Sequence, residues 1–235
     1  MGASPVTRVE LAAEDHTPAG IDVGVILTGG KSSRMGVDKA LMQLDGRTLV
    51  ERLERVLRDA GARRVVAIGG NVEAILSLGI EAVIDHYPGE GPLGGLLTAA
   101  DELQVASTMR VAVVACDLPL LRGATIRRLA QMIAPVPGLS DQPLAWSANP
   151  VPAVAVPVVD GIRQVHVLVM GADALTQLGA ALIAGERSLQ AAMDRVEVVE
   201  VAGVDPEELH DLDRPEDVDD YHRRFCAAEP DAPPY

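Results

Sequence analysis

Four short, almost entirely apolar runs constrain the fold of this chain more than any other feature. They are rich in β-branched residues, they alternate with amphipathic helical patterns, and they cover residues 23–27, 64–68, 82–84 and 111–116. Such runs are typical of strands in a parallel sheet that helices cover on both faces. The alternation of strand and helix therefore predicts an α/β fold with a doubly wound, mostly parallel sheet.

The expected helices carry their own start and stop signals. The clearest one begins with the capping-box sequence Thr48-Leu-Val-Glu51 and stops at Gly61. Another helix is expected to open at Pro215, where acids fill the first turn and arginines the last, as the helix dipole favours. Three more helices are expected: one begins near Pro92, one covers about 124–133 and one covers about 172–184.

The length of 235 residues suits one large domain. We expect a flexible leader over residues 1–20, a single domain over 21–225 and a disordered tail over 226–235. Within the domain, a nucleotide half over about 21–134 and an acceptor half over about 151–225 are separated by a proline-rich stretch. That stretch, residues 135–157, is expected to form a loop, or an edge strand after a loop.

The composition excludes several classes of protein. Lys and Arg number 20 against 34 acids, which gives a net charge of −14, and aromatic residues make up 2% of the chain. A nucleic-acid-binding protein needs a basic face, so we expect no nucleic acid partner. Two cysteines are too few for a disulfide-stapled secreted fold, and no apolar run approaches the roughly 20 residues of a membrane span. We therefore expect a cytoplasmic protein that does not enter membranes, and the sequence does not reveal whether it has a protein partner.

Each apolar run ends in glycine or in a polar residue that suits a ligand. In open α/β sheets, ligands bind outside the carboxyl ends of the strands, which would lie along one edge here. We therefore expect a binding cleft at that edge. The four run ends are Thr28-Gly29-Gly30, Gly69-Gly70-Asn71, Asp85 and Asp117.

The loop after the first run has the chemistry of a polyphosphate site. Its glycines allow close approach of a ligand, and its serines together with Arg34 and Lys39 add donors and positive charge. Of the 20 basic residues only two are lysines, Lys31 and Lys39, and both lie in this loop. The spacing matches neither the dinucleotide fingerprint nor a Walker A loop.

Asp117 follows the last of the four apolar runs directly. A hard oxygen ligand of this kind, together with substrate phosphates, is the usual way in which proteins hold Mg²⁺. The structural alternative is that Asp117 caps the helix that follows. Asp213 has a similar alternative, because Asp213-Arg-Pro-Glu216 is a capping-box-like helix start.

Several segments resemble the molybdenum cofactor guanylyltransferases. Residues 27–39, Leu-Thr-Gly-Gly-Lys-Ser-Ser-Arg-Met-Gly-Val-Asp-Lys, resemble that family's L-A-G-G-x-S-x-R-M-G-x-D-K. Residues 85–95 resemble its D-x-x-P-G-x-G-P-L-A-G loop, and residues 116–119 its C-D-x-P. Weaker likenesses cover residues 155–161 (V-P-x-x-x-G) and 211–217 (N-x-N-T-P-E-D).

The resemblance implies a Rossmann-like nucleotidyltransferase fold and a reaction. That reaction transfers GMP from GTP to the terminal phosphate of molybdopterin, the molybdenum cofactor's organic part, and releases pyrophosphate. It also implies roles for individual residues, with Mg²⁺ carried by Asp117. The nucleotide would contact Leu27, Thr28, Gly29 and Gly30, the phosphates would meet Arg34 and Lys39, and the nucleoside would be held by Asn71 and Asp85.

Three departures from the family pattern keep alternatives open. Thr28 replaces the usual Ala, His166 ends a Gln-Val-His where the family often has Q-P-L, and Asp211 and Asp213 replace two Asn. The Asp-x-Asp is similar to that of related cytidylyltransferases, which leaves CTP open as the donor and makes Asp213 a second candidate metal ligand. Against CTP, Gly29 matches the loop of the guanine-specific family. Two further alternatives remain: a transferase that uses GTP with another phosphate acceptor, and a nucleotide-binding regulator without catalysis.

Overall fold

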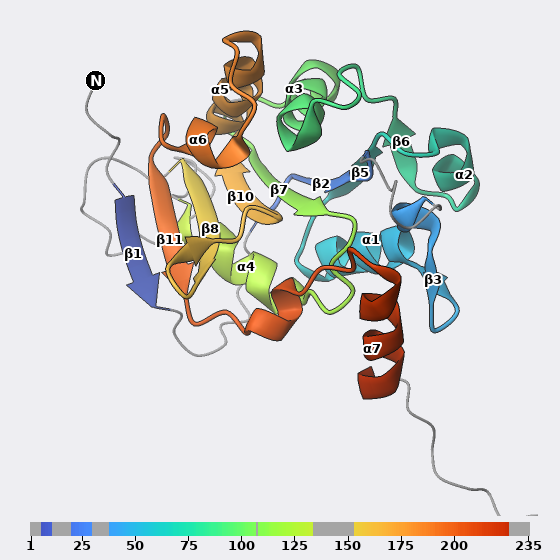
Figure 1. Cartoon of the computed structure of the whole chain (residues 1–235). Coiled ribbons are helices and arrows are strands. Elements are labelled where there is room, and N and C mark those ends of the chain that lie inside the picture. The colour runs from blue at the N-terminus through green and yellow to red at the C-terminus, as the bar shows by residue number, and fades with distance from the viewer. Residues whose placement is uncertain (1–5, 11–19, 30–37, 107, 134–152, 226–235) are drawn as a thin grey trace, which may run out of the picture.

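A central β-sheet runs through the molecule and carries helices on both faces (Figure 1). The computed structural model describes residues 6–10, 20–29, 38–106, 108–133 and 153–225. The strands lie in the order β1-β11-β8-β10-β7-β2-β5-β6. Their bounds are β1 Val6–Glu10, β2 Val23–Leu27, β5 Arg64–Ile68, β6 Glu81–Val83, β7 Arg110–Ala115, β8 Val154–Val159, β10 Val167–Gly171 and β11 Val198–Ala202. The predicted α/β fold is confirmed.

Along this order the sheet is parallel except at β10, which runs antiparallel to both β7 and β8; the short strand β9 Ile162–Arg163 also pairs antiparallel with β8. Strand β2 pairs in parallel with β5 and β7, so that Leu27 lies between Ile68 and Ala115. On the other side of β5, Ile68 pairs with Val83 of β6. The carboxyl ends of these four strands therefore meet at one edge of the sheet, as the sequence predicts.

The five predicted helices begin at or within one residue of their predicted starts, and α2 and α6 are additional. Helix α1 has both capping-box hydrogen bonds: Glu51 N donates to Thr48 Oγ1 at 3.3 Å and Thr48 N donates to Glu51 Oε2 at 2.8 Å. The helical bounds are α1 Leu49–Asp59, α2 Val72–Ser77, α3 Gly91–Leu103, α4 Gly123–Met132, α5 Ala172–Ile183, α6 Leu189–Met193 and α7 Pro215–Phe225, with 3₁₀ turns η1 Lys39–Leu41 and η2 Pro206–Leu209. None of these described helices is long and apolar enough to cross a membrane.

Two apolar layers hold the helices on the sheet. Because successive residues of a strand point to opposite faces, Val114 packs in the layer under α1 and α4, whereas Val113 packs under α3, α5 and α6. Helices α3 and α5 pack so closely at Gly179 that a Cβ added there would lie only 2.8 Å from Leu97 Cα. This packing fixes the start of α3 at the sheet edge where ligands are expected.

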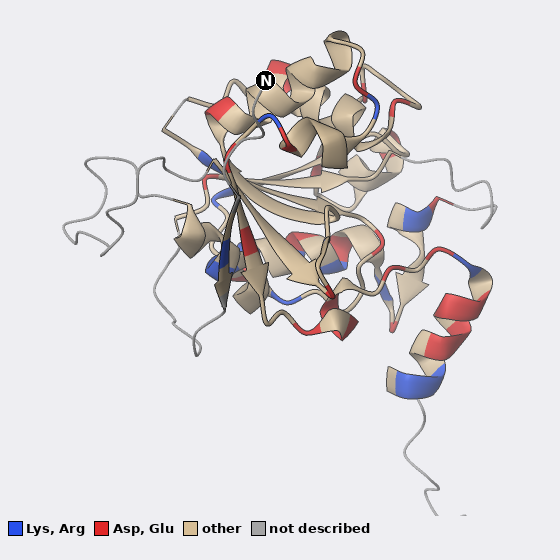
Figure 2. Cartoon of the chain, turned by 60° about the vertical axis from the view of Figure 1, so that its left-hand side comes forward, with Lys and Arg blue, Asp and Glu red and all other residues tan. Residues whose placement is uncertain are grey.

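Helix α7 projects from the body of the molecule (Figures 1 and 2). As predicted, its first turn is acidic and its last turn carries Arg223 and Arg224. Tyr221 anchors it: the ring is buried, and the hydroxyl donates to Asp45 Oδ2 at 3.0 Å, in the hairpin of β3 Gln43–Leu44 and β4 Arg47–Thr48. The segment just before α7 reaches the sheet edge, where Leu212 N donates to Asp117 O at 3.0 Å.

Two sequence-based expectations are wrong. The leader is not flexible throughout, because Val6–Glu10 forms β1, which pairs in parallel with β11, and Arg8 Nε donates to Glu200 Oε2 at 3.1 Å. Strand β8, which contains Pro157, is not an edge strand, since β11 and β10 flank it. The proline is tolerated because β10 pairs only with Val154 and Ala155, before the position where an N–H is missing. The predicted tail, and most of the proline-rich stretch, lie outside the described residues.

Candidate active site

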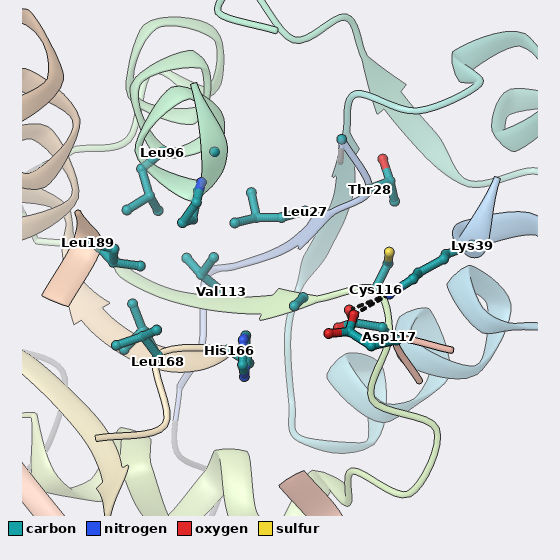
Figure 3. A pocket seen from close by; sticks show the side chains of 16 residues that line it. Leu27, Thr28, Lys39, Leu96, Val113, Cys116, Asp117, His166, Leu168 and Leu189 are labelled. Carbon is teal, nitrogen blue, oxygen red and sulfur yellow. Dashed lines mark hydrogen bonds and ion pairs between the residues drawn. The ribbon is translucent and has the colours of Figure 1, made fainter. Parts of the chain in front are cut away.

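Two cavities open at the carboxyl edge of the parallel strands and share Gly29 and Gly91. We call the first, of about 790 Å³, the glycine cavity, because Gly69 and Gly70 form much of its wall together with Asp85. We call the second, of about 350 Å³, the aliphatic cavity, because leucine and valine side chains form much of its wall (Figure 3). The predicted cleft therefore has two compartments that meet at the end of β2.

The loops after β2 and β5 are joined by hydrogen bonds beside the glycine cavity. The backbone N–H groups of Thr28 and Gly29 both donate to Ile68 O, at 3.0 and 3.1 Å. The buried Thr28 hydroxyl lies within hydrogen-bond distance of the carbonyl oxygens of Ile68 and Gly69, at 2.9 and 2.8 Å. Thr28 therefore turns its hydroxyl toward the neighbouring loop, while the residue also lines the aliphatic cavity.

Gly69 is the position where a side chain would separate these loops. An added Cβ would lie 2.9 Å from Gly29 Cα and 3.1 Å from Gly29 N, and both are backbone atoms that cannot turn aside. We expect Gly69→Ala to weaken binding of GTP, the nucleotide that the sequence resemblance implies, at least tenfold in calorimetric titration. Gly79→Ala is the matched control, since Gly79 also has a positive φ (80°) but no atom within 4 Å of its added Cβ. Both variants carry about 1–2 kcal/mol of left-handed strain, so equal GTP affinities would contradict the prediction.

Asp85 is held against Gly29 by α3. Its Oδ1 accepts hydrogen bonds from Thr98 Oγ1 at 2.9 Å and from Tyr87 N at 3.0 Å. Its Oδ2 would lie 3.3 Å from a Cβ added at Gly29, so this oxygen faces the loop after β2. The fully buried Thr98 is a site residue that the sequence analysis missed, and a lone threonine on the apolar side of α3 is the signal that could have found it.

Asn71 lies beside the glycine cavity without lining it. Its side-chain oxygen accepts from Ala74 N at 3.1 Å and caps α2, while Gly70 and Val72 on either side line the cavity. Its backbone N–H donates at 2.9 Å to Asp38 Oδ2, a second residue that the sequence analysis did not select. Nucleoside binding by Asn71 stays a prediction.

Lys39, Asp117 and Asp213 form one charged cluster at the end of the aliphatic cavity (Figure 3). Lys39 Nζ lies 3.3 Å from Asp117 Oδ2 and 2.6 Å from Asp213 Oδ1. Burial alone would lower the pKa of Lys39, but the hydrogen bond and charge of Asp213 and the charge of Asp117 outweigh it and raise that pKa. Lys39 is therefore a charged ammonium at neutral pH, held between two carboxylates.

Asp117 does not cap a helix, so the structural alternative for it is wrong. Helix α4 begins six residues later, with Arg122 at its N-cap. There, Glu208 Oε2 accepts from Arg122 N at 3.2 Å and from the Thr125 hydroxyl at 2.7 Å. Asp117 instead points its carboxylate into the cluster.

The carboxylates of the cluster fit a magnesium ion. Asp117 Oδ1 is buried and has no hydrogen-bond partner among the described residues, although an orphaned carboxylate oxygen is costly. Oxygen donors are the ligands that Mg²⁺ prefers, and it commonly keeps only one or two protein carboxylates. Since the described residues contain no group of three or more ligating side chains, the other ligands would come from substrate phosphates and water.

The remaining predicted residues of the first loop divide into two groups. Leu27 and Thr28 line the aliphatic cavity (Figure 3), and Gly29 lines both cavities. Gly30 and Arg34 lie outside the described residues, so their roles stay predictions. Cys116 is next to Asp117, but burial raises the pKa of its thiol to about 12, so it is no nucleophile at neutral pH.

The chain matches the family model described as a MobA-like NTP transferase domain over residues 24–199. It is 42% identical over 106 residues to the "Molybdenum cofactor guanylyltransferase" of Xanthomonas euvesicatoria pv. vesicatoria, a match that covers 45% of this chain and 52% of that protein. It is 32% identical to a "Probable molybdenum cofactor guanylyltransferase" of Chloroflexus aggregans, over 72% of this chain and 75% of the relative. In the first of these matches the chain spans about half the length of the relative.

Solved structures show the same fold at low sequence identity. "Molybdopterin-guanine dinucleotide biosynthesis protein A" of Archaeoglobus fulgidus superposes with a TM-score of 0.64 at 16% identity, over 88% of this chain and 100% of that chain. A CMP:2-keto-3-deoxy-manno-octonic acid synthetase complexed with CTP superposes with a TM-score of 0.61 at 17% identity, over 88% and 98%. The family model covers most of the chain, and the fold of the chain agrees with the folds of these solved structures. The chain therefore belongs to the family of MobA-like NTP transferase domains.

Proposed function

We propose that this chain transfers GMP from GTP to the terminal phosphate of molybdopterin and releases pyrophosphate, with Mg²⁺ as its cofactor. The observation that carries the proposal is the Lys39 ammonium between two carboxylates in the aliphatic cavity, which shares Gly29 and Gly91 with the glycine cavity. Two adjoining cavities, one of which carries the charged cluster, suit two substrates that react through their phosphates. The names of the Xanthomonas and Chloroflexus relatives support this choice of substrates.

In this proposal, the glycine cavity receives the nucleoside. Gly69 and Gly70 let the backbone approach the base and ribose, while the fixed carboxylate of Asp85 supplies an acceptor for N–H groups on the edge of guanine. The N-terminus of α3, at Gly91, borders both cavities, and its partial positive charge favours the phosphates nearby.

Lys39 and Asp117 serve the reacting phosphates. An ammonium has three N–H donors, two of which have acceptors in Asp117 and Asp213, so a third is available to a phosphate oxygen. Asp117, with Asp213 beside it, would hold Mg²⁺, which supplies positive charge to the triphosphate when bound.

The chemistry needs charge neutralisation more than proton transfer. An oxygen of the acceptor's phosphate monoester forms a bond to the α-phosphorus of GTP, and the bond between that phosphorus and the bridging oxygen to the β-phosphate breaks. The nucleophile is already an anion and pyrophosphate leaves as one, so no side chain has to act as a general base. Positioning and electrostatic stabilisation by Lys39 therefore account for most of the protein's contribution.

The choice of nucleotide tests the proposal. We expect GTP with Mg²⁺ to raise the melting temperature by roughly 5–10 °C at about 100 times its Kd, since this concentration adds about 2.7 kcal/mol. CTP should give a smaller shift, and pyrophosphate release should require GTP and molybdopterin together. Tight GTP binding without pyrophosphate release from any acceptor would favour a non-catalytic regulator instead.

One observation favours a second candidate, transfer of CMP from CTP to molybdopterin. Asp213, where the guanylyltransferases have Asn, lies 2.6 Å from Lys39 and gives the cluster a second carboxylate. This Asp-x-Asp pattern is similar to that of cytidylyltransferases. A melting shift with CTP that equals or exceeds the shift with GTP would support the second candidate against the first.

A further inference from the structure

We propose that His166 selects the acceptor, whose flat ring system lies against it in the aliphatic cavity with its phosphate toward Lys39. This inference rests on the proposed function and deepens it, because it assigns a place and a recognition residue to the second substrate. The acceptor class that this site fits is a phosphate monoester of a planar heterocycle with hydrogen-bonding groups on its edge.

The aliphatic cavity suits a ring rather than a polar chain. Leu27, Val113, Leu168 and Leu189 contribute to its wall, and its volume of about 350 Å³ falls within the range of small-molecule sites. The nucleoside is already accommodated by the glycine cavity, where Asp85 and the glycine backbone offer polar contacts. The aliphatic cavity is therefore available to the acceptor.

The charged cluster fixes the direction in which the acceptor must lie. Lys39 and Asp117 line one side of the aliphatic cavity, while Leu168 and Leu189 lie on the other, with His166 between them (Figure 3). A phosphate placed near Lys39 leaves the ring system to extend along the apolar wall. In that orientation the ring passes His166.

His166 also borders a second, polar recess. This recess has a volume of about 210 Å³, and Gln164, His210 and Asp211 line it together with His166. His166 is thus shared by the apolar cavity and the polar recess. A planar ring that lies in the first can place the hydrogen-bonding groups of its edge toward the second.

The backbone holds His166 in register with Asp117. Ala115 N, two residues before Asp117, donates to His166 O at 2.8 Å. Gln164 N donates to Pro157 O at 2.8 Å and fixes the turn that leads to His166. The imidazole is exposed to the cavities, can donate or accept a hydrogen bond, and offers a flat face to a ring. Where the related family often has leucine, this chain therefore places a recognition group at a fixed distance from the reacting end.

The test compares acceptor and nucleotide binding in His166→Leu, which introduces an apolar side chain and removes the hydrogen-bonding nitrogens. Under anaerobic conditions, we expect the Kd and KM for molybdopterin to rise about tenfold, because one hydrogen bond is lost. The Kd for GTP and kcat should change less than twofold. His166→Gln restores a donor and an acceptor and should recover most of the affinity for molybdopterin.

His222→Leu is the matched control, because this exposed histidine lies on α7, away from both cavities. It should leave both substrates' constants unchanged. The inference is overturned if His166→Leu binds molybdopterin as tightly as the wild type, if it loses GTP affinity equally, or if wild-type protein binds no molybdopterin.

The outcomes separate this inference from the proposed function. Binding of molybdopterin that depends on His166, without pyrophosphate release from any nucleotide, would overturn the proposed function and support the role of His166. Pyrophosphate release from GTP and molybdopterin, with an unchanged KM in His166→Leu, would support the function and overturn the role of His166.

Discussion

Replacement of Asp117 by Asn should leave the protein folded and reduce pyrophosphate release at least a hundredfold at saturating Mg²⁺. Asn keeps the shape of the side chain but removes the charge that faces Lys39 at 3.3 Å. It also removes the carboxylate whose buried Oδ1 has no hydrogen-bond partner among the described residues, the oxygen best placed for a cation. The measurement is pyrophosphate release, with the melting temperature followed in parallel.

Asp194→Asn is the control, because it also removes a carboxylate from an ion pair but lies outside the charged cluster. Asp194 Oδ1 pairs with Arg163 Nη1 at 3.0 Å, and its side chain is 65% exposed. An exposed ion pair contributes little, so this variant should keep normal activity and stability. If Asp117→Asn is folded and retains more than about a tenth of normal activity, the metal-binding role of Asp117 is wrong.

The strands of the first half could be predicted because both of their faces are covered. Val23–Leu27 and Arg64–Ile68 agree with the observed bounds of β2 and β5, since a nearly unbroken apolar run is the pattern that burial on two sides requires. The capping box at Thr48 located the start of α1 for a similarly local reason. Where neighbouring residues determine an element, the sequence is sufficient.

The elements that were missed depend on partners far along the chain. Val6–Glu10 has only a short strand-like pattern, and it becomes a strand because β11 offers a free edge and Glu200 accepts from Arg8. The interior position of β8 likewise follows from its pairing with β10 and β11, and not from its own proline-containing sequence. Long-range pairing of this kind leaves no local signal.

The candidate site divides in the same way. Lys39 and Asp117 were predicted because each follows a strand or loop with a distinctive motif, and parallel pairing brings such ends together. The contact of Asp213 with Lys39 joins residues 174 positions apart, and the neighbouring Leu212 N donates to Asp117 O at 3.0 Å, a bond that also joins segments far apart in the sequence. The aliphatic cavity could not be predicted, because it forms where the antiparallel strand β10 lies beside β7.

Lys39→Ala is expected to weaken both GTP binding and turnover, with pyrophosphate release reduced on the order of a hundredfold. The ammonium would meet the triphosphate with a charge-assisted hydrogen bond, which is roughly twice as strong as a neutral one. Its loss also leaves Asp117 and Asp213 without their shared cation. Added Mg²⁺ should therefore stabilise Lys39→Ala more than the wild type, which melting curves with and without Mg²⁺ would measure.

Two companion variants and the pH dependence decide whether Lys39 acts as a compact charge. Lys39→Arg should not fully restore turnover, because a planar guanidinium is a poor copy of an ammonium that fits between two carboxylates. Lys31→Ala, at a variable position of the same loop, should retain activity within a few-fold.

Because the pKa of Lys39 is raised, its ammonium and the stability that it contributes are present below the ordinary lysine value and are lost only as the pH rises beyond it. The ratio of wild-type to Lys39→Ala activity should therefore stay constant between about pH 7 and pH 10. A ratio that falls across this range would show that the pKa of Lys39 is not raised, and a larger loss in Lys31→Ala would show that the phosphates meet a different cation.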